Sequence, residues 1–272
     1  SLTFGSFTTD TRARFLELVA SVTPEGLGRI QLFSGGAEAV EAALRLAKAA
    51  TGKQEVVSFW GGFHGKTGGV LGLLGSEFKH HQGPFLPGQY STPYADCYRC
   101  PLKLRYPDCG IACAEYVRDV IRYQTAGEIA AIIVEPIQGT AGNIIPPDGF
   151  LRAVQSVARD HGALFFADEM ITGFGRTGAM WGTEHEGIVP DIMTVGKGVG
   201  GGFPLSAVIS TDTLTQAKPW SNPSFSSSSY GGNPLASAAG LAALQIILNE
   251  DLVKNADRVG SVMLPQLPRL KG

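Results

Sequence analysis

The sequence predicts an α/β fold with a mostly parallel central sheet and helices on both of its faces. Short, continuously apolar runs alternate along the chain with longer segments in which apolar residues recur at helical spacing. Continuous apolarity over about four to six residues is typical of strands buried on both faces, as in a parallel sheet between two helix layers. Ionisable residues follow several of these runs directly, at the strand ends where open α/β sheets bind ligands.

Three segments have the spacing of an amphipathic helix, at 15–22, 38–48 and 150–158. In the first of them, apolar residues stand at i, i+3, i+4 and i+7, which places them on one helix face. Asp10 lies just upstream and is the candidate N-cap of this helix, because a short acidic side chain accepts a hydrogen bond from a free helix N–H.

Five apolar runs predict strands, namely EVVSFW (55–60), AAIIVEP (130–136), ALFFADE (163–169), DIMTVG (191–196) and LSAVIS (205–210). Three ionisable residues follow three of these runs: Glu135, Asp168 and Lys197. One such residue carries little information, but three at three strand ends predict a shared crevice at one edge of the sheet.

Composition excludes several classes of protein. The 272 residues include 22 Lys and Arg against 24 Asp and Glu, a formal net charge of −2, which argues against nucleic-acid binding. No apolar run approaches the roughly 18 residues that a membrane helix needs. We find no secretory signal and expect a cytoplasmic protein. The 36 glycines exceed an average share of about 7% and predict tight turns and backbone pressed against a ligand.

Four cysteines fall in one stretch, at Cys97, Cys100, Cys109 and Cys113. Their spacing, C-x2-C, eight residues and C-x3-C, is compatible with a structural zinc ion in a proline-containing loop. Reduced thiols packed in a long loop explain the same residues without a metal, and we favour this second interpretation. The structural zinc ion therefore stays open as an alternative.

Glycine patterns that suggest nucleotide binding do not have the required surroundings. WGGFHGKT (60–67) lacks the first glycine of a P-loop, and GFGRTG (173–178) is followed by a segment without helical periodicity. A better placed pair of glycines, Gly35 and Gly36, stands directly before the strong amphipathic helix at 38–48. Free N–H groups and the helix dipole make such a start an anion site that suits a phosphate.

Two of the strand-end residues fit one cofactor. Lys197 lies between two glycines after an apolar strand, where a shielded lysine loses its proton more easily, as a Schiff-base nucleophile must. Asp168 ends a strongly apolar strand, and a buried carboxylate there needs a cationic partner such as a protonated pyridine nitrogen. With the phosphate cradle, these residues predict a site for pyridoxal 5'-phosphate (PLP).

Six motifs together resemble the class III, or ω-amino-acid, aminotransferases of PLP fold type I. In chain order they are SGGAEAVEAALRLAK, FHGKTGG, VEPIQGTAG, FFADEMITGFGRTG, GKGVGGGFPLSA and SYGGNPLASAAG, which extend from Ser34 to Gly240. The combination is far more specific than any one motif. It implies the large PLP-binding domain of that fold.

The resemblance implies a role for each matched residue. Lys197 would bind PLP covalently, and Asp168 would pair with the pyridine nitrogen, so that both act in catalysis. Phe63 matches the aromatic residue that stacks on the cofactor ring, and Gly36 and Ala37 match the backbone donors to its phosphate.

Four further positions belong to the implied cofactor site. Glu135 lies in the matched VEPIQG motif, and Met170 takes the place of a branched residue that packs on the other ring face. Ile171 stands where many members carry a glutamine that bonds the ring hydroxyl. Ser229 matches a threonine that reaches the partner's phosphate across a homodimer interface.

The resemblance implies a ping-pong aminotransferase that works through a Schiff base at Lys197. It would move an amino group from an ω-amino acid, amine or amino acid to a 2-oxo acid, pyruvate or 2-oxoglutarate. A decarboxylating transaminase or an amino-acid racemase of the same family is the alternative, and a truncated or non-catalytic interaction domain is the alternative outside enzymes. We expect residues 1–272 to form the large domain, without the N-terminal segment and C-terminal small domain of the family.

Overall fold

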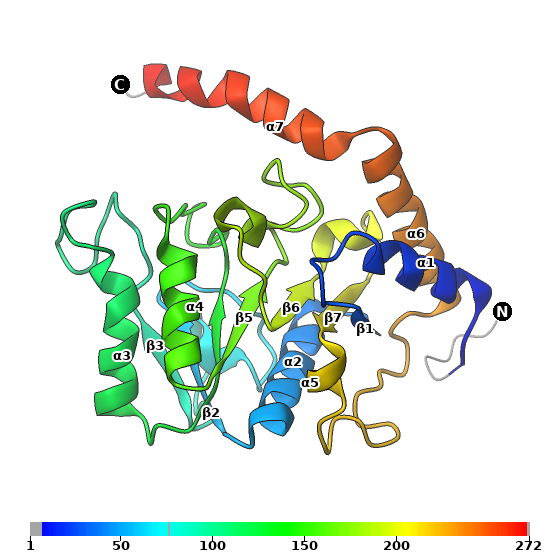
Figure 1. Cartoon of the computed structure of the whole chain (residues 1–272), viewed down its shortest axis with the longest axis horizontal. Helices are drawn as coiled ribbons and strands as arrows, with labels where there is room; N and C mark the ends of the chain where they lie inside the picture. The colour runs from blue at the N-terminus through cyan, green and yellow to red at the C-terminus, as the bar shows by residue number, and fades with distance from the viewer. Residues whose placement is uncertain (1–6, 76, 271–272) are drawn as a thin grey trace.

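The computed structural model describes residues 7–75 and 77–270, and a seven-stranded sheet forms its centre (Figure 1). The strands are β1 (Arg29–Phe33), β2 (Glu55–Phe59), β3 (Gln89–Thr92), β4 (Ile129–Val134), β5 (Leu164–Asp168), β6 (Ile192–Val195) and β7 (Ser206–Ser210). Their order across the sheet is β1-β7-β6-β5-β4-β2-β3. β7 pairs antiparallel with β1 and with β6, and the other four strand pairs are parallel, so the predicted mostly parallel sheet is confirmed.

The helices are α1 (Asp10–Ala20), α2 (Gly36–Thr51), α3 (Ala112–Gln124), α4 (Phe150–Asp160), α5 (Asp212–Thr215), α6 (Pro234–Asn249) and α7 (Leu252–Met263). All three predicted helices are present. The predicted N-cap of the first helix is wrong. Thr9 occupies the cap and its hydroxyl accepts from the N–H of Arg12 at 3.3 Å, whereas Asp10 is the first helical residue.

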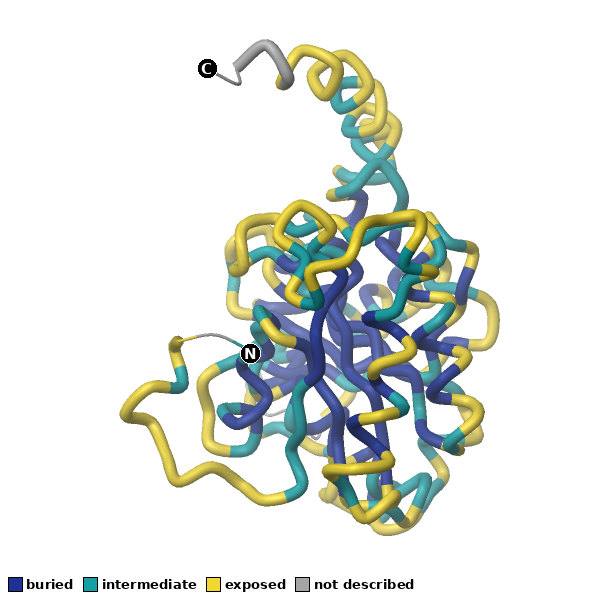
Figure 2. The backbone as a smooth tube through the Cα atoms, turned by 90° about the vertical axis from the view of Figure 1, so that its left-hand side faces the viewer, coloured by how far each residue is buried: buried dark blue, intermediate teal, exposed yellow. Residues whose placement is uncertain are grey.

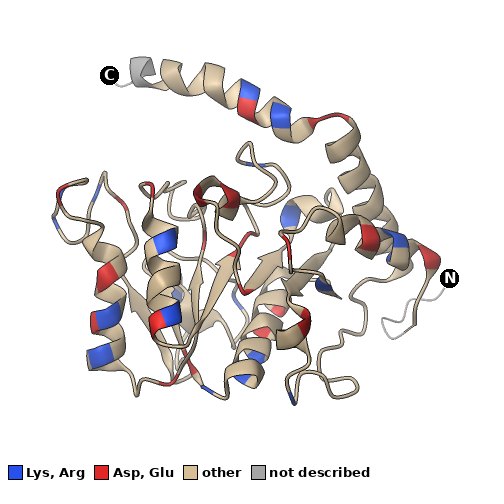
Figure 3. Ribbon diagram, viewed as in Figure 1, with Lys and Arg blue, Asp and Glu red and all other residues tan. Residues whose placement is uncertain are grey.

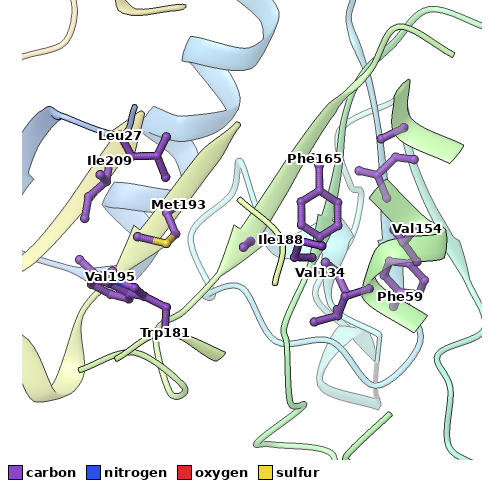
Figure 4. Packing of buried hydrophobic residues seen from close by; sticks show 14 of the residues in the cluster. Leu27, Phe59, Val134, Val154, Phe165, Trp181, Ile188, Met193, Val195 and Ile209 are labelled. Carbon is purple, nitrogen blue, oxygen red and sulfur yellow. The ribbon is translucent and has the colours of Figure 1, made fainter. Parts of the chain in front are cut away.

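Helices cover both faces of the sheet, as the sequence predicted. α2 packs against β6, β7 and β4 on one face, while α4 packs on β4 and β5 and α3 packs on β3 and α4 on the other. Successive strand residues face opposite layers: Phe165 belongs to the cluster with Val154 of α4, and Phe166 to the cluster with α2. Figure 4 shows the first cluster, with Phe59 and Val134 beside Phe165. Both strand faces are therefore buried, which explains their continuous apolarity.

The buried residues concentrate in the sheet and its flanking helices, and α7 extends away from this body (Figure 2). None of the residues of α7 is buried. Both signs of charge occur on α3 and α4 (Figure 3), in agreement with the nearly balanced composition. Among the described residues, no single helix has the length and apolarity to span a membrane, although α6 and its continuation over 252–267, bent by 58°, meet that criterion as a pair.

Candidate active site

The sheet brings the three predicted strand-end residues to one edge. Val134 pairs with Ala167, so Glu135 follows β4 level with Asp168 at the end of β5. Asp168 pairs in turn with Thr194 of β6, and Lys197 comes three residues later. Because these strands are parallel, their carboxyl ends meet at the same edge, as predicted.

Asp168 is buried, with 2% of its surface exposed, and it is paired with a histidine. Its Oδ2 lies 2.7 Å from Nδ1 of His64, and its Oδ1 accepts from the Met170 N–H at 3.2 Å and the Thr194 hydroxyl at 3.3 Å. Burial lowers the pKa of His64, but the hydrogen bond and charge of Asp168, with the charge of Glu135, outweigh burial and raise it. The pair therefore favours an imidazolium beside a carboxylate.

Sequence reasoning gave no role to His64, although the residue lies in the FHG motif. The two partners are 104 residues apart, and only the fold brings them together. A histidine beside a predicted strand end was the available signal. The structure assigns it to holding Asp168 at the edge of the sheet.

Glu135 is buried and contacts the loop that carries Phe63. Its Oε1 accepts from the Phe63 N–H at 2.8 Å and its Oε2 from the Gly139 N–H at 3.4 Å. Burial raises the pKa of Glu135 to about 7, with a further contribution from Asp168, while His64 and the two backbone donors act in the opposite direction. The carboxylate thus positions the loop and shares one electrostatic environment with Asp168 and His64.

The loop with Phe63 is pressed against the start of α2. The Phe63 ring lies edge-on to the Phe78 ring, with 6.0 Å between centroids. A Cβ added to Gly65, whose φ is +115°, would lie 2.4 Å from the Cβ of Ala37. Only glycine permits this approach, which places the predicted stacking residue beside the predicted phosphate donors.

Two side chains fix the turn before α2, one from β7 and one from α2 itself. The Ser206 hydroxyl donates to the Gly35 carbonyl at 2.8 Å. The Glu38 carboxylate accepts from the N–H groups of Ser34 at 3.1 Å and Gly35 at 3.3 Å. The backbone at this helix start is therefore held in place by its own protein contacts.

Three N–H groups at the start of α2 have no acceptor within the helix. The Gly35 carbonyl accepts from Ala39, so Gly36, Ala37 and Glu38 are the leading donors. No heavy atom lies within 4 Å of where a Gly35 Cβ would stand, so the space before the helix is open. The predicted anion cradle is present, and Glu38 adds a donor that the sequence interpretation did not include.

Met170 joins this cradle to the lysine. A Cβ added to Gly36 would lie 3.3 Å from the Met170 sulfur, and one added to Gly196 only 2.6 Å from it. Ile171 packs beside Met170 along the chain and against Gly139, whose added Cβ would approach Ile171 Cδ1 to 2.1 Å. Met170, the predicted ring-face residue, thus lies between the helix start and the strand that leads to Lys197, while Ile171, at the predicted ring-hydroxyl position, lies against Gly139.

Lys197 lines a cavity of about 300 Å³ together with Met170 and Ile171. Its backbone has φ +44°, an unfavourable conformation for a residue other than glycine that is often found at functional sites. The prediction that this lysine is shielded is wrong, because its side chain is exposed. The glycines on either side, Gly196 and Gly198, contribute no side chain that could cover it.

Ser229 is exposed, whereas Ser228, the residue before it, is only partly exposed. The Ser228 hydroxyl donates to Glu38 Oε1 at 2.6 Å and accepts from the Gly231 N–H at 3.2 Å. Ser228 thus ties the serine-rich loop to the start of α2 of the same chain, while Ser229 faces solvent. Its contact with a partner's phosphate stays a prediction.

The four cysteines lie in another part of the molecule, between β3 and the start of α3, and all are free thiols. Burial raises the pKa of Cys113 to about 11, although the N–H groups of Ala114 and Cys113 act against burial. Across residues 7–75 and 77–270, no three ligating side chains are placed to hold a metal ion.

The donor set of the crevice fits PLP. The open start of α2 offers N–H groups to a phosphate, and buried Asp168 offers a negative charge to a protonated ring nitrogen. Lys197 lines the neighbouring cavity together with Met170, which also lies close to Gly36 at the start of α2. The phosphate, the ring nitrogen and the aldehyde of the cofactor therefore each have a matching partner in this chain, whereas Ile171 offers no donor to the ring hydroxyl.

A mostly parallel sheet with an open helix start, a buried aspartate and a lysine at its carboxyl edge defines an α/β protein whose site fits PLP. The chain belongs to the class III aminotransferase family, whose sequence model matches residues 1–272. Its structure is similar to that of an amine transaminase from an uncultivated Pseudomonas species, solved in its PLP-bound form. The TM-score is 0.92 at 32% identity, over 99% of this chain and 64% of the other. This similarity confirms fold type I.

Two curated relatives differ in the reaction that their names describe. The diaminobutyrate–2-oxoglutarate aminotransferase of Rhizobium meliloti (strain 1021) is 38% identical over 270 residues, which are 97% of this chain. The leucine/methionine racemase of Thermococcus litoralis is 35% identical over 260 residues, or 94% of this chain. The chain spans 57% of the length of each relative.

Proposed function

We propose that this protein is a PLP-dependent aminotransferase. It transfers an amino group from an ω-amino acid, an amine or an amino acid to a 2-oxo acid, pyruvate or 2-oxoglutarate, in two half-reactions at one site. The observation that carries the proposal is the convergence of Asp168, Lys197 and the open start of α2 on one edge of the sheet. Cytoplasmic localisation and a homodimer in which Ser229 reaches the partner's phosphate site belong to the same proposal.

Several residues would hold the cofactor. The N–H groups of Gly36 and Ala37 would bind the phosphate, Phe63 and Met170 would pack against the ring, and Lys197 would be the point of covalent attachment. When bound, PLP supplies an electron sink for the electron pair that is left when the substrate loses its α-proton. Ile171 has no hydrogen-bonding group, so a different donor serves the ring hydroxyl.

The protein groups divide the proton transfers between them. The Lys197 amine, on a flexible exposed side chain, takes the α-proton and returns one as general base and acid. Asp168 would hold the proton on the ring nitrogen of the bound cofactor, since a buried carboxylate stabilises a cation beside it. His64 holds Asp168 in place through the 2.7 Å contact with its second oxygen. Glu135 fixes the Phe63 backbone and with it one wall of the crevice.

A racemase is the second candidate, because the same lysine and aspartate serve a reaction that only moves a proton, and one relative is named as a leucine/methionine racemase. Racemisation without a 2-oxo acid separates the two activities. Release of carbon dioxide during amino transfer identifies a decarboxylating transaminase.

The proposal is tested by borohydride reduction of the PLP-incubated protein, followed by peptide mass mapping. We expect one pyridoxyl adduct, on Lys197, and none in Lys197→Ala. Lys48, in the last turn of α2, and Lys254 of α7 serve as internal controls for non-specific labelling. Labelling that is equal at all lysines, or that persists in Lys197→Ala, would refute the site. The same Lys197→Ala variant is expected to have no turnover.

A further inference from the structure

Two cavities share lining residues beside Lys197. The smaller cavity, of about 300 Å³, is the one that Lys197 lines. The larger, of about 570 Å³, is lined by residues that follow β4 and by residues of α7. Ile171, Arg176 and Ala256 line both cavities. Spaces of this size are typical of sites for small organic molecules.

The smaller cavity has positive charge in its wall and no negative charge. Of the described residues that line it, only Arg176 and Lys197 are ionisable, and the rest are apolar residues or glycines. The proposed attachment of PLP uses the amine of Lys197, so Arg176 is left as the cation of this cavity. A guanidinium has a planar fork of N–H donors that matches the two oxygens of a carboxylate.

The guanidinium of Arg176 is available to a ligand. The side chain is exposed, and none of the acidic side chains that the structure describes forms an ion pair with it. Two acids, Asp148 and Glu186, line the larger cavity beside Arg176. The Glu186 carboxylate accepts instead from the N–H groups of Leu151 at 3.1 Å and Arg152 at 3.0 Å.

The backbone fixes the position of Arg176 at the cavity wall. The Gly178 N–H donates to the Gly175 carbonyl at 3.2 Å, which puts Arg176 at the second position of a tight turn. A Cβ added to Gly175, whose φ is +85°, would lie 2.7 Å from the nearest atom of α7. Before the turn, the Phe174 ring packs against buried Trp181, with 4.9 Å between the ring centroids. A ligand therefore meets a turn that is already ordered.

We propose that Arg176 binds the carboxylate of the substrate, so that the amino donor is an amino acid and not a simple amine. This inference rests on the proposed function and narrows its class of donor. The apolar wall of the smaller cavity would contact the carbon chain of the donor. The 2-oxo acid of the second half-reaction also has a carboxylate, and the same guanidinium would bind it.

The first test measures binding without turnover. Pentanoate, a carboxylate without an amine, is titrated by calorimetry into the full chain before and after incubation with PLP. Arg176→Gln is expected to weaken pentanoate binding about tenfold or more in both forms, since charge-assisted hydrogen bonds are lost. Arg176→Lys keeps the charge without the fork and is expected to have an intermediate affinity. Because the Arg176 side chain is exposed and unpaired, the melting temperatures should not change.

Arg258→Gln is the matched control, because it removes the same charge from an exposed arginine of α7 that lines neither cavity. It is expected to leave the affinity for pentanoate unchanged. Absence of pentanoate binding at millimolar concentrations, or equal weakening in Arg176→Gln and Arg258→Gln, would overturn the inference.

A set of amino donors separates failure of this inference from failure of the proposed function. Norvaline, 5-aminopentanoate and pentylamine share a five-carbon chain, and only pentylamine has no carboxylate. In Arg176→Gln, the KM of both amino acids is expected to rise about tenfold or more while that of pentylamine and the labelling of Lys197 stay unchanged. An equal change for all three donors would overturn the role of Arg176. Absence of a PLP adduct on Lys197 would overturn the proposed function instead, and pentanoate binding alone would then decide the role of Arg176.

Discussion

Two buried glutamates on neighbouring strands differ in the direction of their pKa shift. Glu55 begins β2 at the amino edge of the sheet and is 8% exposed. Its carboxylate accepts from the N–H groups of Ala126 at 3.0 Å and Glu128 at 3.0 Å and from the Tyr90 hydroxyl at 3.0 Å. Burial raises its pKa, but these hydrogen bonds outweigh burial, and the pKa ends below its ordinary value.

Glu135, at the carboxyl edge, is 6% exposed and has fewer donors. One of its two backbone hydrogen bonds is long, at 3.4 Å, and Asp168 adds a second negative charge nearby, so its pKa rises to about 7. The donors at the amino edge thus favour the ionised form of Glu55, whereas burial and the nearby charge of Asp168 favour the protonated form of Glu135 at the carboxyl edge. A carboxyl group with a raised pKa in a crevice is typical of a functional site, and one with several hydrogen-bond donors is typical of a structural one.

The largest effect is expected for Asp168→Asn. The amide removes the charge that we propose to keep the cofactor nitrogen protonated, so the half-reaction with an amino donor should slow roughly 10²–10³-fold, the cost of losing one preorganised electrostatic group. The fold and the attachment of PLP to Lys197 should persist. Single-turnover absorbance kinetics and thermal melting measure the two effects separately, and a rate near that of the unaltered protein would contradict the assigned role.

Glu135 should make the chain less stable as the pH rises. Its pKa is about 7 in the folded chain and near 4.5 when unfolded, so the folded state binds the proton more tightly. This contribution to stability is complete below pH 4.5 and is lost as the pH rises to about 7, at roughly 1.4 kcal/mol per pKa unit. The raised pKa of His64 adds a loss of the same sign above pH 6.5.

The measurement is urea unfolding across pH 4.5–7 for the unaltered chain and for Glu135→Gln. The glutamine still accepts from the Phe63 N–H but cannot titrate, so the difference between the two stability curves isolates Glu135. An unchanged pH dependence in the variant would show that the proton resides elsewhere in the cluster of Glu135, His64 and Asp168.

Glu55→Gln should lower stability by about 1–3 kcal/mol, because an amide replaces a charged acceptor of several buried donors. The contribution of Glu55 to stability depends on pH with the opposite sign to that of Glu135. The lowered pKa of Glu55 means that its contribution is present above pH 4.5 and is lost as the pH falls below that value. The labelling of Lys197 by PLP should not change in this variant. A loss of labelling at unchanged stability would contradict the assignment of a structural role to the amino edge and a functional role to the carboxyl edge.

The sequence predicted the parts of the fold whose pattern is strong. The five apolar runs are buried strands, and the helices at α1, α2 and α4 have clear helical spacing. β1 and β3 were missed because they are only partly buried and contain polar residues, so neither forms a continuous apolar run. α6 was missed because it is apolar around most of its circumference, so no helical period stands out.

The site was predictable where it depends on strand ends and not where it depends on side-chain contacts. Glu135, Asp168 and Lys197 follow apolar runs, and parallel strands bring such residues together. The His64–Asp168 pair spans 104 residues and has no local pattern. The exposure of Lys197 follows from the absence of cover over a glycine-flanked turn, which apolarity of the preceding strand does not reveal.

The smallest expected effect is a difference in PLP affinity between alanine substitutions at the two ends of β7. Ser206 and Ser210 bound β7, are both buried, and each donates a 2.8 Å hydrogen bond to a carbonyl, of Gly35 and Asp191 respectively. Either change to alanine should cost about 1 kcal/mol of stability. Only Ser206→Ala loosens the turn before α2, so it alone should weaken PLP binding, by roughly fivefold.

Ser210→Ala is the matched control for this comparison, since it removes the same type of bond at the amino edge. We would measure the PLP affinity of both variants by titration followed by absorbance, and their stability from melting temperatures. If the two variants bind PLP equally well, the Ser206 bond stabilises the sheet in general and does not preorganise the phosphate cradle. A difference in affinity at equal stability would instead show that the carboxyl edge uses an ordinary hydrogen bond to hold its ligand-binding backbone.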